Sequence, residues 1–255
     1  MSATAQSLIV FLCIAGSALI GFKVRRFLPE HHLSSDSLLA VSLTTGLAAT
    51  LVSLVLGLMV SSTHSSFGKL NDDVAQIAAK TIFIDRMLLQ YGNQAGESRR
   101  LLSRAHAASV DYLHAVRSSD GVFSDNAVRQ AGLEAFLASV RQLVPKNDEQ
   151  REIKAYVVEQ GWRLAETRWL FAEQNRSSIP PIFFIALVAW LCFIFFGFGL
   201  ITDNNTTVLC SLLGGALLAS SAIFVILEMD SPLDGLVSVS IAPMDSASAI
   251  LGRAP

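Results

Sequence analysis

The chain has 255 residues, of which 52% are hydrophobic and only 16% are charged, and its mean hydropathy is +0.49. An ordinary soluble domain carries about 25% charged residues, and a disordered chain needs low hydrophobicity and high charge, so the composition excludes both. The net charge of −2 argues against a nucleic-acid partner, because nucleic-acid-binding domains carry a basic face. Of the 40 charged residues, 29 lie between His64 and Arg176. The nearly uncharged flanks predict an integral membrane protein.

Four apolar stretches predict membrane-spanning helices. A helix needs about 20 apolar residues to cross the hydrocarbon core, and each of these stretches contains no charged side chain. They are residues 1–22, 37–63, 177–202 and 204–227. Four spans place both termini and the region between the second and third spans on one side of the membrane.

The basic residues Lys23, Arg25 and Arg26 follow the first apolar stretch. A signal peptide begins with its basic residues, so this order favours an uncleaved anchor. The positive-inside rule gives most weight to short loops, which places loop 23–36 in the cytoplasm and the central region outside. The count of basic residues near the span ends is nearly equal on the two sides, so the rule favours this orientation only slightly.

The region after the second span predicts a long helix that leaves the membrane. No proline interrupts it, and apolar residues recur at alternating steps of three and four, which is a heptad-like pattern. We call these residues the seam: Phe67, Leu70, Val74, Ile77, Thr81, Ile84 and Leu88. Gly92 and Asn93 are stop signals that end this helix.

Three further helices are predicted in the central region, over 95–118, over 125–143 and from Asp148 toward Pro180. Residues 236–241 alternate apolar residues with serine and predict a short extended segment. The expected architecture is all-α: an integral membrane protein with four transmembrane helices and a helical extramembrane domain inserted between helices two and three. The expected boundaries are 1–63 for helices one and two, 64–178 for the helical domain, 179–228 for helices three and four, and 229–255 for a short polar C-terminal tail.

No motif in the sequence indicates catalysis, a metal or a cofactor. The five histidines form no H-E-x-x-H pair, and there is no G-x-S-x-G, Walker loop, G-x-G-x-x-G or C-x-x-C. We therefore expect a non-enzymatic protein with no metal site and no cofactor. The spans also contain no embedded charge, which argues against a proton-coupled transporter but not against a passive pore.

Small residues form a stripe along the second span. Such stripes let helices approach closely, either within one chain or at an oligomer or pore interface, and the sequence leaves both interpretations open. The stripe, the candidate helix-packing or pore face, comprises Ser42, Gly46, Ala49, Ser53 and Gly57.

A polar motif follows the fourth span at the membrane edge. Its carboxylates could hold a cation or cap a loop, and a solvated turn built on Asp and Pro is the simpler interpretation. The motif comprises Glu228, Asp230, Pro232, Asp234 and Gly235.

Several stretches of the chain resemble a bacterial membrane family of unknown function, the bestrophin-like family also called domain of unknown function 4239. They are Leu28–Leu33, Gly46–Leu51, Ile84–Arg86, Phe196–Leu200 and Leu227–Gly235. The family's last motif has a phenylalanine where this chain has Leu233. The resemblance implies a multi-pass protein of the bacterial inner (plasma) membrane, similar to pentameric anion channels with a cytosolic helical domain. A cytosolic position of the helical domain disagrees with the positive-inside rule, which places this domain outside.

Three functions are compatible with these patterns. The first is a non-enzymatic membrane protein that acts through helix-mediated association, with lipid and a second copy or another protein as partners. The alternative is an oligomeric bestrophin-like anion channel, in which the second span surrounds the axis and apolar residues form the gate. The hydroxyls of Thr44, Thr45 and Thr50 and the helix N-termini would supply positive partial charge for the anion. The third is an enzyme or a metal-dependent protein that uses the carboxylates after the fourth span.

Overall fold

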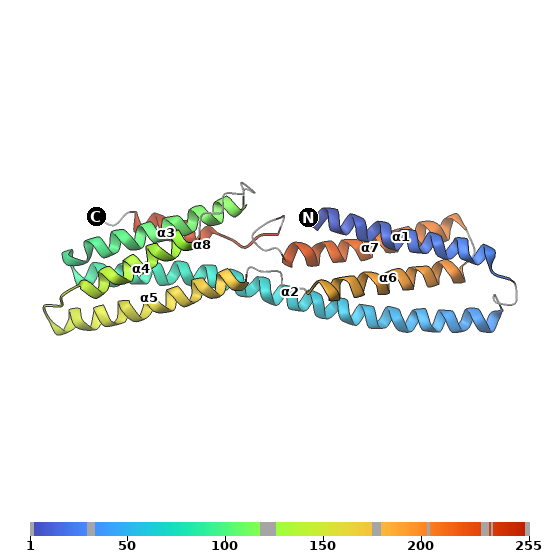
Figure 1. Cartoon of the computed structure of the whole chain (residues 1–255), viewed down its shortest axis with the longest axis horizontal. Coiled ribbons are helices and arrows are strands. Elements are labelled where there is room, and N and C mark those ends of the chain that lie inside the picture. Colours follow the sequence, from blue (N-terminus) through green and yellow to red (C-terminus); the bar gives the residue numbers. More distant parts are fainter. Residues whose placement is uncertain are drawn as a thin grey trace. The chain divides into compact units, whose positions relative to one another are not determined.

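A computed structural model describes residues 3–29, 34–117, 126–174, 180–202, 205–230, 235 and 237–252, and the described chain is helical (Figure 1). Its elements are α1 (Ala3–Phe27), α2 (Ser35–Tyr91), the 3-10 turn η2 (Asn93–Ala95), α3 (Gly96–Arg117), α4 (Asn126–Gln142), α5 (Asp148–Gln174), α6 (Pro181–Ile201), α7 (Thr206–Asp230) and α8 (Ala242–Leu251). The helices α1, α2, α6 and α7 are long and apolar enough to cross a membrane. The predicted all-α class with four spans is confirmed.

The chain divides into two compact units, which we describe separately. The membrane unit comprises Met1–Ser66 and Ser177–Asp230, and the helical unit comprises Phe67–Arg176 and Ser231–Pro255. Helix α2 contributes its first half to the membrane unit and its second half to the helical unit.

Close backbone contact between α1 and α6 organises the membrane unit. A Cβ on Gly199 would overlap the carbonyl oxygen of Ala18, and a Cβ on Gly21 would overlap that of Phe196. The two helices approach this closely because glycine has no side chain at the contact. Arg25 at the end of α1 donates hydrogen bonds to the carbonyl oxygens of Leu200 and Ile201, so a cation caps the C-terminus of α6.

We expect Gly199→Ala to destabilise the protein by roughly 1–3 kcal/mol, the usual cost of overpacking a well-packed contact. The added methyl would meet a backbone carbonyl, so α1 and α6 would have to separate. Gly214→Ala on α7 is the matched control, because no described atom outside the backbone of α7 lies within 4 Å of the position of its Cβ. Thermal unfolding in detergent measures both variants. Equal unfolding temperatures for the two would show that the glycine contact contributes nothing.

The seam of α2 forms one side of the core of the helical unit. Six of its seven residues are buried and Phe67 is half-buried, as a heptad-like pattern on a core-facing helix requires. Helix α2 continues without a break through Tyr91, and Gly92 then adopts a φ of 106°, a conformation that favours glycine and ends the helix. The predicted long helix and its stop signal are confirmed.

Helices α3, α4 and α5 complete this core with Leu102, Phe136 and Val157, each fully buried. Their bounds lie within a few residues of the predicted ranges. A largely buried ion pair connects α3 to α2. The Nε of Arg99 donates to Oδ1 of Asp85 at 2.8 Å, and the Asp85 side chain is 3% exposed.

The C-terminal region differs from the expected polar tail. Ala242–Leu251 forms helix α8, which packs against α3 and buries Met244, Ala247 and Leu251. Together with Ile241, these apolar residues recur at steps of three and four. The sequence therefore contains the helical period, but only over a short stretch. The expected extended segment forms no strand over residues 237–241, and Leu236 lies outside the described residues.

Candidate functional site

Helix α2 is the least covered helix of the membrane unit. Only 11% of its most apolar stretch is buried within the chain, compared with 22–33% for α1, α6 and α7. Thr45, Val52 and Thr63 form the buried face of its membrane half. The remaining faces of this half are available to lipid or to another protein.

The side of α2 opposite the buried face consists of leucines. Their spacing of 4, 7 and 4 residues keeps them on one side of a helix that turns about 100° per residue. We call this set the leucine face: Leu43, Leu47, Leu54 and Leu58, which are 62–66% exposed. This face is not among the residues predicted from the sequence, and its heptad-like spacing is the signal that indicates it.

The small-residue stripe lies between the buried face and the leucine face. Ser42, Gly46, Ser53 and Gly57 are exposed, and Ala49 is half-buried. Apart from the backbone of α2 itself, no described atom lies within 4 Å of a Cβ built on Gly46 or Gly57. Packing within the chain therefore does not account for these two glycines, and the role of the stripe as a helix-packing or pore face stays a prediction.

The three threonine hydroxyls of the second span lie on three different sides of α2. Thr45 is buried and its hydroxyl lies against Gly197 of α6, where it has no hydrogen-bond partner among the described residues. Thr44 donates to the carbonyl oxygen of Ala40, and Thr50 donates to that of Leu47. Residues at these spacings cannot share one helix face, so at most one of the three hydroxyls can face the axis of a pore, and a role for any of them with an anion stays a prediction.

The polar motif after the fourth span is only partly described. Glu228 is buried near the end of α7, Asp230 is half-buried, and neither lacks an interaction partner. Gly235 has a φ of 118°, which suits a turn, and Pro232 and Asp234 lie outside the described residues. The described part of the chain contains no group of three side chains placed to hold a metal. A cation-binding or capping role for the motif stays a prediction.

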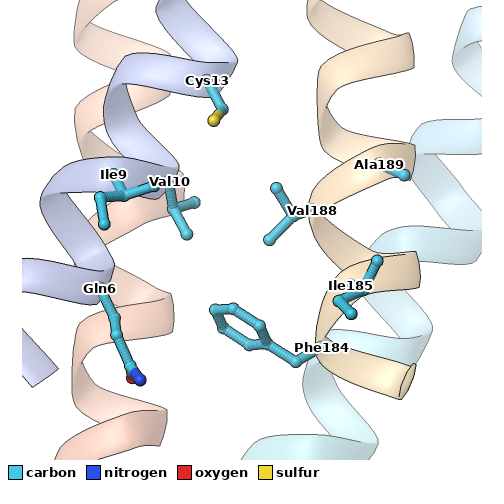
Figure 2. A pocket seen from close by; sticks show the side chains of 8 residues that line it. All are labelled: Gln6, Ile9, Val10, Cys13, Phe184, Ile185, Val188 and Ala189. Carbon is cyan, nitrogen blue, oxygen red and sulfur yellow. The ribbon is translucent and has the colours of Figure 1, made fainter. Parts of the chain in front are cut away.

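A groove of about 450 Å³ lies between the first halves of α1 and α6 (Figure 2). Figure 2 shows Val10 and Val188 facing each other across it, with Gln6 and Phe184 toward the same end. None of the lining residues carries a charge, so the groove is suited to apolar material rather than to an ion. The lining residues are Gln6, Ile9, Val10, Cys13, Phe184, Ile185, Val188 and Ala189.

Comparison with known proteins identifies the family. Residues 11–244 match the Bestrophin-like domain. Among solved structures, two variants of a bacterial bestrophin homologue from Klebsiella pneumoniae match with TM-scores of 0.69 and 0.68 at 13% and 14% identity. A structure described as a membrane protein matches with a TM-score of 0.68 at 13% identity. Each of these matches covers 96% of this chain and 97% of the other. No curated protein matches the sequence.

Proposed function

The chain belongs to the bestrophin-like family, and we propose that it assembles into an oligomeric ion channel in which α2 of each copy surrounds the pore. The observation that carries this proposal is the uncovered membrane half of α2. It has the small-residue stripe beside the buried face and the leucine face opposite it. A helix in a ring needs three such sides, one toward its own chain, one toward a neighbouring copy and one toward the axis.

The three sides of α2 have the chemistry that these positions require. The buried face packs within the chain through Thr45 and Val52. The stripe permits close approach of a neighbouring helix, because Gly46 and Gly57 leave the backbone accessible. The leucine face then points to the axis, where a ring of leucines forms an apolar constriction that closes the pore by excluding water.

Chloride is the permeant ion that we expect. The resemblance to anion channels supports this choice, and so does the absence of any carboxylate from the stretch of α2 between Ser37 and Thr63. Backbone dipoles and helix N-termini would supply the positive partial charge, because no lysine or arginine lies in this stretch either. We prefer this proposal to association through the helical unit, because no contact among the described residues specifically supports such association. The proposal assigns the protein no enzymatic role.

Two measurements on the same preparation test the proposal. The mass of the purified protein in mild detergent should correspond to several copies of the chain. The protein in liposomes should pass chloride, and sodium flux measured in parallel tests the expected anion preference. A well-folded monomer that passes neither ion would overturn the proposal, and a channel that prefers sodium would overturn only the choice of ion.

Gly57→Leu should prevent assembly without unfolding the chain. The structure leaves room for the leucine within one chain, but the stripe could no longer approach a neighbouring helix. We expect the assembled fraction to fall more than tenfold, measured by size-exclusion chromatography with light scattering. Gly214→Leu on α7 is the control, because this glycine is also exposed and also has open space around it. Parental oligomers from both variants would mean that the stripe contacts lipid.

A further inference from the structure

Two histidines of α3 attach the C-terminal helix α8. The Nε2 of His106 lies 3.0 Å from the carbonyl oxygen of Met244, and the Nε2 of His114 lies 3.1 Å from Oδ1 of Asp245. His106 is 1% exposed, whereas the side chains of His114 and Asp245 are about half exposed. The contact of α8 with α3 therefore includes one buried and one exposed titratable group.

The hydrogen bond to Met244 fixes the proton on His106. A carbonyl oxygen only accepts, so Nε2 must donate, and in the neutral ring Nδ1 is then an acceptor. Nδ1 is buried and has no hydrogen-bond partner in the described structure. A second proton on this ring would place an N–H group and a positive charge in a buried position with no acceptor, which is unfavourable.

Two charged groups on other helices act on the protonation of His106. Arg168 of α5 disfavours the protonated ring, and Asp245 of α8 favours it. Burial is the largest influence and lowers the pKa of His106. The hydrogen bond to Met244 is the next largest and raises it, and the net result is a pKa below the ordinary value of 6.5.

We propose that α8 is a pH-sensitive element, and that proton uptake by His106 releases Ala242–Leu251 from α3. Release exposes the ring to water, which relieves the burial of its charge. It also exposes Met244, Ala247 and Leu251, so α8 remains docked while His106 is neutral.

The sign of the effect follows from proton linkage. The docked state has the lower pKa, so the released state binds the proton more tightly. The stability of docking is complete above about pH 6.5 and falls as the pH drops from that value through the lower pKa of docked His106. The pair between His114 and Asp245 is exposed and screened by solvent, so it contributes only weakly to docking.

A distance measurement by pulsed electron paramagnetic resonance tests the proposal on the full-length protein. The three cysteines are replaced, and spin labels are placed at the exposed positions Ala107 on α3 and Ser246 on α8. We expect one narrow distance distribution at pH 8 and a broad, longer one at pH 5. An unchanged distribution at pH 5 would overturn the proposal.

Two variants assign the effect to the buried histidine. His106→Gln cannot take up a proton, so its distribution should stay narrow at pH 5, whereas His114→Gln should still broaden. Equal broadening of the His106→Gln variant and the parent would contradict the proposal. If His106→Gln does not fold, the parent alone remains decisive, because release must be centred below pH 6.5. A transition centred above that pH would contradict the role of a buried imidazole.

Discussion

Replacing Leu54 by threonine is expected to raise ion flux through the reconstituted protein by at least about tenfold. Leu54 lies in the middle of the leucine face and is 62% exposed in the single chain. In a ring of copies, the substitution would exchange several apolar side chains at the constriction for hydroxyls that retain water. A decrease of 1.4 kcal/mol in the barrier is enough for a tenfold increase in rate, and several threonines at one level should exceed it.

Leu218→Thr is the matched control for this experiment. Leu218 belongs to α7 and is 72% exposed, so it is an equally accessible leucine on a different helix of the membrane unit. Its replacement should leave flux at the parental level. Equal flux from the parent and both variants, in preparations with the same oligomeric mass, would show that the leucine face does not line the pore.

The second large effect concerns the ion pair between Asp85 and Arg99 in the helical unit. Arg99→Leu would leave the carboxylate of Asp85 in a position that is only 3% exposed and without its guanidinium partner. Removal of one partner from a buried pair costs about 3–5 kcal/mol. Since 1 kcal/mol shifts the unfolding temperature of a chain of this size by about 2–4 °C, we expect a decrease of about 10 °C.

The double variant Asp85→Leu with Arg99→Leu should recover much of this stability, because it removes the unpaired charge as well. Glu159→Gln is the control for an exposed pair. It removes the negative charge that faces Arg163 in a pair whose side chains are both more than half exposed, and such pairs contribute about 0–1 kcal/mol. Unfolding followed by circular dichroism measures all variants. A single Arg99→Leu variant as stable as Glu159→Gln would contradict the assignment.

The sequence predicted the helices well where a periodic pattern was long. The seam of α2 repeats over several turns, and Gly92 is a strong stop signal, so both the helix and its end were predictable. Helix α8 was missed because it has 10 residues and follows an alternating stretch that suggested a strand. Its stability comes from burial of Met244 and Ala247 against α3, and a tertiary contact of this kind leaves only a weak pattern in the sequence.

The candidate site was predictable only in part. The stripe was visible as small residues at helical spacing, but the sequence could not tell that Gly57 is uncovered while Gly21 and Gly199 meet backbone atoms. Both kinds of glycine look alike in an apolar span, and only the position of the neighbouring helix separates them. The leucine face has a heptad-like spacing, but leucine is common on every side of a membrane helix, so this spacing does not by itself show which side other helices leave uncovered.

The central claim is that the leucine faces of several copies meet around one axis, and cross-linking between copies tests it most directly. In a cysteine-free background, Leu54→Cys and Leu218→Cys are each treated with a short thiol cross-linker in membranes. We predict a cross-linked dimer for Leu54→Cys and monomer for Leu218→Cys, because a single cysteine in each copy can be joined to only one other copy. Monomer for Leu54→Cys, with cross-linked species for Leu218→Cys, would contradict the claim and would place α7 at the contact between copies.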